Sequence, residues 1–196
     1  EHLLIDDDHV EIIPNGVDLE RIDRARDSGY DIRTHFDIPE ESIIVGTASV
    51  ISEQKALDTL VAGVASANER CDHRLDLVIA GDGPHRTEIE AVVESFEMQK
   101  YVHFTGMVDR TTVYQILGEI DIYAMPSRWE GFSNAAVEAL AAGNPCVFSD
   151  IDPFFMPYRN VALFHTLDDV NDLADRLIEL SVHPDRGRLY GQQGRE

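Results

Sequence analysis

The chain has 196 residues, 43% of them hydrophobic, and a formal net charge of −21 at pH 7. This length and composition are typical of a globular domain with a sizeable core, and the acidity argues against nucleic acid or an anionic membrane surface as its partner. No apolar stretch approaches the ~20 residues of a membrane-spanning helix. Cys71 and Cys146 suit neither a disulfide framework nor a metal site, so we expect reduced thiols and a cytoplasmic location.

The positive charge comes almost entirely from arginine, because Lys55 and Lys100 are the only two lysines. A dense acidic surface with little lysine resembles the proteins of salt-loving organisms, although a high-GC genome also favours arginine over lysine. We therefore expect a halophilic source and a fold that responds to salt.

Short apolar and β-branched runs alternate with amphipathic stretches along the chain. The runs that predict strands are residues 10–13, 42–47, 75–80, 101–104, 120–125, 145–149 and 161–164. The stretches that predict helices are residues 55–68, 86–97, 111–117, 134–142 and 168–181. This alternation predicts an α/β fold with a doubly wound, Rossmann-like parallel sheet of about six strands, which binds ligands beyond the carboxyl ends of its strands.

The two ends of the chain look like parts of a larger protein. Residues 1–8 are interpreted as an acidic linker from a missing N-terminal domain, and residues 9–196 as one domain. The tail from residue 183 is polar, and we expect a short helix that packs against another part of that protein.

The segment of residues 127–143 is the most informative about function. Ser133 is a good N-cap for a helix that begins at Asn134 and ends before Gly143, so Glu130 precedes the helix and Glu138 lies inside it. Free amides at a helix start favour an anion, and the flanking carboxylates can accept hydrogen bonds from hydroxyl groups. A diphosphate between two polyols, as in a nucleotide-sugar, has that shape. The alternative is a loop-capping Glu130 and a solvated Glu138.

Other motifs carry less information. Gly81 and Gly83 follow a predicted strand and precede a helix, like a phosphate-binding turn, but we favour a role in shaping the loop over direct ligand contact. No histidine has a partner at metal-ligand spacing, and no Ser-His-Asp arrangement or serine elbow is present. Trp129 is interpreted as a packing residue that fixes the loop before Glu130.

Five segments resemble, in order and spacing, the C-terminal, donor-binding half of the retaining glycosyltransferases of family 4, which have the two-domain GT-B fold. These segments are residues 10–18 (VEIIPNGVD), 79–84 (IAGDGP), 102–108 (VHFTGMV), 121–127 (DIYAMPS) and 130–145. The resemblance covers nearly the whole chain. It implies that the N-terminal half of the fold lies outside this sequence.

The resemblance also implies roles for individual residues. Glu138 is expected to bind the ribose hydroxyls of the nucleotide, and Glu130 to contact hydroxyls of the donor sugar and to act in catalysis. The backbone amides of three residues would face the sugar and the phosphates, and the main chain of two others would receive the base. The first three are Phe132, Ser133 and Asn134, and the other two are Met107 and Val108.

The family carries a basic pair for the diphosphate, and this chain departs from it. Lys55 stands at the lysine position, but Val50 occupies the arginine position and Ala56 the glycine position that follows the lysine. Because the family uses no metal, the basic pair neutralises the leaving diphosphate, and valine cannot do so. Either Arg128 or another arginine substitutes, or the register shifts in a loop, or activity is weakened.

Three functions are compatible with these residues. The first is the donor domain of a metal-independent retaining hexosyltransferase, which would use a UDP- or GDP-sugar to extend a polysaccharide, glycolipid or polyprenyl carrier. The full enzyme could then work at the inner face of the membrane, whereas the isolated domain would bind its donor without catalysis. The second is a catalytically degenerate binding or scaffolding module, marked by Val50. The third is a sugar-nucleotide epimerase with the same type of fold.

Overall fold

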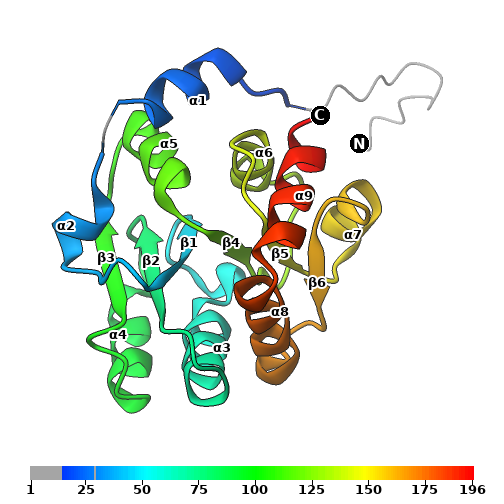
Figure 1. The fold of residues 1–196 in the computed structure, drawn as a ribbon. Coiled ribbons are helices and arrows are strands. Elements are labelled where there is room, and N and C mark those ends of the chain that lie inside the picture. Colours follow the sequence, from blue (N-terminus) through cyan, green and yellow to red (C-terminus); the bar gives the residue numbers. More distant parts are fainter. Residues whose placement is uncertain (1–14, 29) are drawn as a thin grey trace, which may run out of the picture.

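The computed structural model describes residues 15–28 and 30–196, so the predicted linker and the predicted strand at residues 10–13 lie outside the described residues. Within these ranges, helices cover both faces of a six-stranded parallel sheet (Figure 1). The strands are β1 (Ile43–Ala48), β2 (Leu75–Ala80), β3 (Val102–Gly106), β4 (Ile122–Met125), β5 (Cys146–Ser149) and β6 (Leu163–His165). The predicted α/β fold is therefore confirmed.

The order of the strands fixes where a ligand can bind. The sheet runs β3-β2-β1-β4-β5-β6, so the chain leaves β1 toward one edge, returns, and continues from β4 toward the other edge. The loops that follow β1 and β4 therefore diverge at the carboxyl end of the sheet. Such a topological switch point is where open α/β sheets bind their ligands.

The helices form two layers with separate apolar cores, one on each face of the sheet. The layer that includes Tyr114, Leu140 and Phe154 contains α1 (Leu19–Arg26), α5 (Arg110–Glu119), α6 (Asn134–Ala141) and α7 (Asp152–Tyr158). The layer that includes Leu60, Ile89 and Leu177 contains α3 (Leu57–Arg70), α4 (Arg86–Ser95) and α8 (Val170–Val182). The five predicted helices thus exist, with ends that differ by a few residues.

The C-terminal helix α9 (Pro184–Arg195) forms as predicted, but it packs against this domain itself. It contacts α6, α8 and β5, and the Arg195 guanidinium donates a hydrogen bond to the carbonyl of Ala141 at 2.7 Å. Gly191 lies so close to the carbonyl of Gly143 that an added Cβ would be 2.1 Å from that oxygen. The glycines of this tail, which look unfavourable for a helix in the sequence, are what permit the contact.

Three helices were not predicted. Helix α1 is capped by Asp18, whose side chain accepts a hydrogen bond from the amide of Arg21, and the short α2 (Ile32–Phe36) is capped in the same way by Asp31. Helix α7 contains two prolines, one at its start and Pro157 near its end. Proline is tolerated in a first turn, and Phe154 buries itself against Phe148 of β5 in spite of the helix breakers.

The segment that carries Lys55 also differs from prediction. Residues Glu53–Lys55 form a 3-10 turn, and α3 begins only at Leu57. Between them Ala56 has a φ of 49°, a left-handed conformation that favours glycine. This conformation explains why a glycine, as expected from the family resemblance, would suit the position of Ala56.

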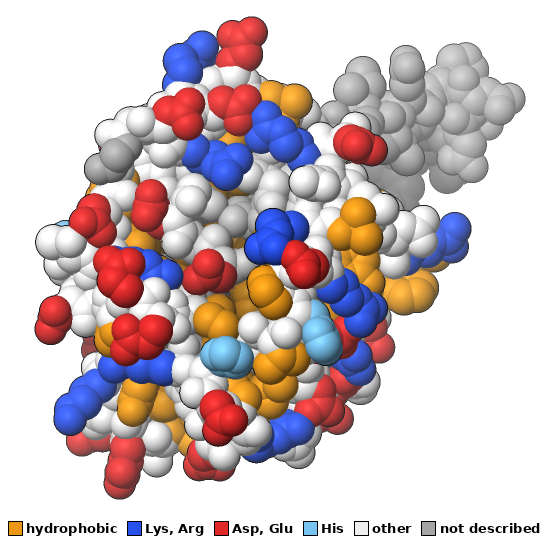
Figure 2. Space-filling view, viewed as in Figure 1, with side chains coloured by type: hydrophobic (Ala, Val, Ile, Leu, Met, Phe, Trp, Pro, Cys, Tyr) orange, Lys and Arg blue, Asp and Glu red, His pale blue; other side chains and the backbone are white. Residues whose placement is uncertain are grey.

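The thiols of Cys71 and Cys146 are both free, and Cys146 is fully buried, which raises its pKa. Acidic side chains are spread over several elements of the face shown in Figure 2, with Lys and Arg between them, rather than gathered in one patch. On this face the charge therefore acts as a distributed surface field.

Candidate functional site

The loops after β1 and β4 are joined by hydrogen bonds at the carboxyl end of the sheet. The side-chain amide of Gln54 donates to the carbonyl of Trp129, and the backbone amide of Arg128 donates to the carbonyl of Gln54, both at 2.8 Å. This pairing brings the Lys55 Nζ to 2.5 Å from Oε1 of Glu130. The two side chains are only 16% and 6% exposed, so the ion pair is largely shielded from water. The structure thus unites the two residues that were predicted to be catalytic.

Arg128 also connects these loops by ion pairs and a hydrogen bond. Its guanidinium pairs with Asp58 at 2.8 Å and with Asp168 at 2.9 Å, and it donates to the carbonyl of Glu53 at 2.9 Å. The hydrogen bond to Asp58 is the main cause of a raised pKa for Arg128. The guanidinium is therefore already engaged. This geometry does not favour the idea that Arg128 supplies the cation missing at Val50.

Helix α6 begins at Asn134, four residues after Glu130. Ser133 is the N-cap, as predicted, and its hydroxyl oxygen accepts a hydrogen bond from the amide of Ala136 at 3.3 Å. The side chain of Asn134 accepts a hydrogen bond from Asn15 at 2.9 Å. Phe132, in the approaching loop, is 45% exposed. The amides of the first turn are the anion-binding element of such a site.

Glu138 lies one turn further along α6 and is 9% exposed, which contradicts the interpretation as a solvated helix residue. Its Oε1 accepts a hydrogen bond from the hydroxyl of Tyr114 at 3.0 Å and lies 3.5 Å from the Nε of Arg110. Burial, and then the bond to Glu138, raise the pKa of Tyr114. Neither Arg110 nor Tyr114 was predicted from the sequence as a partner of Glu138. The sequence signal that could have found them is Asp109, a good N-cap residue directly after the predicted base-binding segment. It predicts a helix whose first turns contain Arg110 and Tyr114 close to the base.

Two cavities meet at Glu138. One has a volume of about 440 Å³ and is lined by Asn15, Gly16, Val17, Asp18, Arg21, Arg110, Tyr114, Asn134 and Glu138. The other has a volume of about 240 Å³ and is lined by Ala48, Ser49, Val50, Ala80, Gly81, Asp82, Met107, Val108, Val113, Ala135 and Glu138. Together they form a concave surface around one buried carboxylate. The first cavity is lined mostly by polar and charged side chains, and the second mostly by apolar ones. A concave surface with convergent polar groups beside an apolar wall is typical of a ligand site.

The second cavity collects the residues predicted to receive the base. Met107 is 84% exposed, and Val50 is 60% exposed. Val108 and Gly81 also line this cavity. The base-binding role of these residues stays a prediction, but their common position fits it.

The glycine turn holds two loops together. A Cβ added to Gly81 would lie 2.0 Å from the carbonyl oxygen of Ser49, and one added to Gly83 would lie 2.3 Å from the carbonyl oxygen of Ile51. Gly81 also has a φ of +141°. Both positions therefore require glycine for backbone packing, which supports the loop-shaping role favoured above. Trp129 is 53% exposed, which does not favour its predicted packing role.

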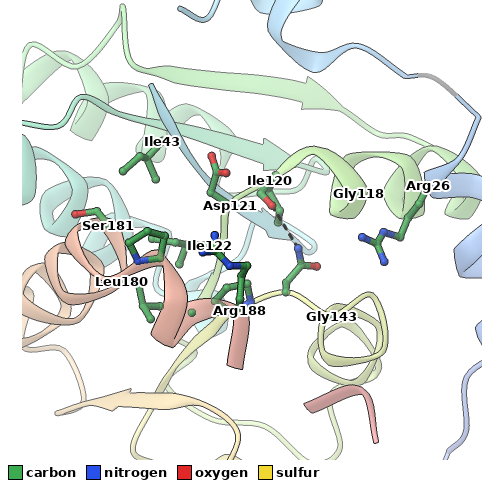
Figure 3. Close-up of a pocket in the computed structure, with 14 residues that line it drawn as sticks. Arg26, Ile43, Gly118, Ile120, Asp121, Ile122, Gly143, Leu180, Ser181 and Arg188 are labelled. Carbon is green, nitrogen blue, oxygen red and sulfur yellow. Dashed lines mark hydrogen bonds between the residues drawn. The ribbon is translucent and has the colours of Figure 1, made fainter. Parts of the chain in front are cut away.

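A separate cavity of about 270 Å³ lies at the opposite, amino-terminal end of the strands, near the starts of β1, β4 and β5 (Figure 3). Arg26, Asp121 and Arg188 are among its lining residues. Its described lining contains none of the residues predicted to bind the donor.

Comparison with known proteins identifies the family. Residues 41–182 match the family model described as "Glycosyl transferases group 1". The chain belongs to the group 1 glycosyltransferases. It is 25% identical over 182 residues to the O-antigen biosynthesis glycosyltransferase WclY of Escherichia coli, which covers 93% of this chain and 48% of that protein. It is 32% identical over 143 residues to the putative glycosyltransferase EpsF of Bacillus subtilis, which covers 73% of this chain and 36% of that protein.

Solved structures agree on the fold. Sucrose-phosphate synthase from Thermosynechococcus elongatus superposes with a TM-score of 0.79 at 24% identity, covering 94% of this chain and 46% of that one. Anabaena HepE, in a complex with UDP and glucose, gives a TM-score of 0.81 at 18% identity, with coverage of 94% and 51%. These neighbours are GT-B glycosyltransferases. The chain spans about half the length of the first curated relatives it matches.

Two further observations concern residues 15–28 and 30–196. No helix among them is both long and apolar enough to cross a membrane. In the same part of the chain, no three His, Cys, Asp or Glu side chains gather as a group that could hold a metal ion.

Proposed function

We propose that this chain is the donor-binding part of a metal-independent, retaining glycosyltransferase that moves a hexose from a UDP- or GDP-sugar to a glycan or lipid-carrier acceptor. The observation that carries the proposal is the shielded Lys55–Glu130 ion pair, which joins the segments that precede α3 and α6, together with the buried Glu138 in the second turn of α6. The acceptor site would come from a second domain of the same protein.

Each residue has a chemical task in this proposal. Glu138 accepts hydrogen bonds from the ribose hydroxyls, and the amides of the first turn of α6 receive the phosphates. Glu130 binds a hydroxyl of the sugar and holds Lys55 in place, so that the ammonium faces the diphosphate as it leaves. Lys55 and the helix start thus stabilise the negative charge that develops when the glycosidic bond breaks. The main chain at Met107 and Val108 receives the base.

The family assignment and two named ligands support a nucleotide-sugar donor. HepE binds UDP and glucose in its solved complex, and the TarM structure from S. aureus contains UDP. Both share the fold of this chain at TM-scores of 0.81 and 0.70. The likeness is one of fold, so the base and the sugar have to be determined directly.

The test is a calorimetric titration of the full-length protein with UDP-, GDP- and ADP-sugars in the presence of EDTA. We expect saturable binding of one UDP- or GDP-sugar without added metal. The product of the best donor, examined by NMR, should keep the anomeric configuration of the donor. Inversion of that configuration would refute the retaining mechanism, and a strict metal requirement would refute metal independence.

The exposed Val50 favours one second candidate, a degenerate binding module that senses or scaffolds without catalysis. Such a module would bind the donor with the same Glu138 contacts but release no sugar. Slow hydrolysis of the donor by the full-length protein, followed as released nucleoside diphosphate, separates the two. Hydrolysis that disappears in Lys55→Met supports the enzyme, whereas tight binding without turnover supports the module.

A further inference from the structure

Two arginines line the 440 Å³ cavity beside Glu138. The guanidinium of Arg21 lies over the ring of Tyr114, 5.8 Å from its centroid, and donates to the hydroxyl of Thr111 at 3.4 Å. Arg110 lies 3.5 Å from Glu138, and its side chain is 59% exposed. Arg21 is thus fixed between two groups of α5, whereas Arg110 has one charged contact and room to move.

The charges at the start of α6 do not suffice for a diphosphate. The charge of Lys55 is balanced by Glu130 at 2.5 Å, and Val50 supplies none. Arg128 is engaged by Asp58 and Asp168. A bound diphosphate would therefore meet a nearly neutral site on a chain with a net charge of −21, and would need a further cation.

Arg110 is within reach of that diphosphate. In a nucleotide the first phosphate is joined to the ribose, so it lies within one side-chain length of a carboxylate that holds the ribose hydroxyls. Arg110 already touches that carboxylate. Arginine also presents a planar fork of donors that fits phosphate oxygens better than a lysine ammonium does.

We propose that Arg110 is the diphosphate-binding arginine of this chain and replaces the cation that is missing at Val50. Without ligand, Arg110 neutralises Glu138. When the donor binds, Glu138 accepts the ribose hydroxyls and the Arg110 guanidinium turns to the phosphates. This inference rests on the proposed function, and it places the cation on α5 instead of the loop after β1.

The test compares nucleoside, monophosphate and diphosphate binding to the full-length protein and to Arg110→Gln. The probes are uridine, UMP and UDP, and the same guanosine series, measured by calorimetric titration at one fixed salt concentration. We expect a loss of about tenfold or more for the diphosphate and less than about threefold for the nucleoside, because only phosphates use the guanidinium. Arg110→Lys should recover part of the diphosphate affinity.

The matched control is Arg24→Gln, which removes one positive charge from an exposed pair with Glu20 on α1. It should leave all three affinities unchanged. An equal loss for nucleoside and diphosphate in Arg110→Gln would show that Arg110 only positions Glu138, and no loss would remove it from the site; either result overturns the inference while the proposed function stands. If the wild-type protein binds neither UDP nor GDP, the proposed function itself is refuted.

Discussion

Replacement of Glu138 by glutamine tests the assignment of the ribose site. The variant keeps the size and one oxygen acceptor of the side chain, so the hydroxyl of Tyr114 still has a partner. The charge that attracts Arg110 is lost, but this pair is 59% exposed on the arginine side. An exposed pair contributes less than about 1 kcal/mol. The bond from Tyr114 also loses its charged acceptor, while the cost of burying a charge disappears, so the free energy of unfolding should change by no more than about 2 kcal/mol.

The effect on binding should be larger. A hydrogen bond to a charged acceptor contributes about 1.5–3 kcal/mol, and a neutral one about 0.5–1.5 kcal/mol. If two ribose hydroxyls use the carboxylate, its replacement should cost about 1.5–3 kcal/mol, which is a tenfold to hundredfold loss of affinity. The loss should be similar for a nucleoside and its diphosphate, because both contain the ribose.

Calorimetric titration with uridine, UDP, guanosine and GDP measures the affinity for the nucleoside and for its diphosphate. Thermal unfolding checks that the variant keeps its fold. The control is Glu94→Gln, an exposed glutamate of α4 in the other helix layer, which should bind like the wild type. Unchanged affinity in Glu138→Gln with an intact fold would refute the ribose assignment. A loss confined to ligands with phosphates would show that the carboxylate acts on the diphosphate side.

Three further outcomes follow from the structure. Glu130→Gln should remove the advantage of the sugar-bearing donor over free UDP or GDP, measured by titration with both, since Glu130 is assigned to a hydroxyl of the sugar. The side-chain oxygen of glutamine can still accept a hydrogen bond from Lys55, so the affinity for UDP or GDP should stay within about threefold. Burial opposes the ionisation of Asp76, but hydrogen bonds from His103, Arg74 and Ser42 outweigh it and hold the pKa at about 2. Because this pKa is depressed from 3.8, the carboxylate should contribute about 2 kcal/mol of stability above pH ~4, and this contribution is lost as the pH falls to ~2. The urea concentration at the midpoint of unfolding should therefore fall between pH ~4 and ~2 in the wild type, and should change less over this range in Asp76→Asn. The melting temperature should rise as KCl increases from ~0.01 M to 1 M, where the Debye length shrinks from ~30 Å to ~3 Å, and a flat or falling curve would speak against self-repulsion of the acidic surface.

Most of the fold could be predicted because its signals are local. Each strand of the described sheet is a short apolar run, and α6 carries its own N-cap at Ser133. Helix α7 could not be found in this way, since Pro157 argues against a helix until the burial of Phe154 is known. The tail helix was predicted, but its partner was not. Its packing depends on the close approach of Gly191 to Gly143, which sequence alone does not reveal.

The site divides along the same line. Glu130, Lys55 and Glu138 could be named because each belongs to a contiguous motif. In the structure all three follow β1 or β4 at the carboxyl end of the sheet. Arg110 and Tyr114 could not be named, because they reach Glu138 from α5, a helix that is separate in the sequence and is brought to α6 only by the fold. Residues that act across helices carry no spacing signal in the chain.

The central claim is that the donor binds at the start of α6, and the most direct measurement is a crystal structure of the full-length protein with the nucleoside diphosphate selected by titration. The account predicts ribose hydroxyls within hydrogen-bond distance of Glu138 and a diphosphate at the amides of Ser133 and Asn134, facing Lys55. A nucleotide bound instead in the cavity lined by Arg26 and Asp121, at the amino-terminal end of the strands, would contradict this claim.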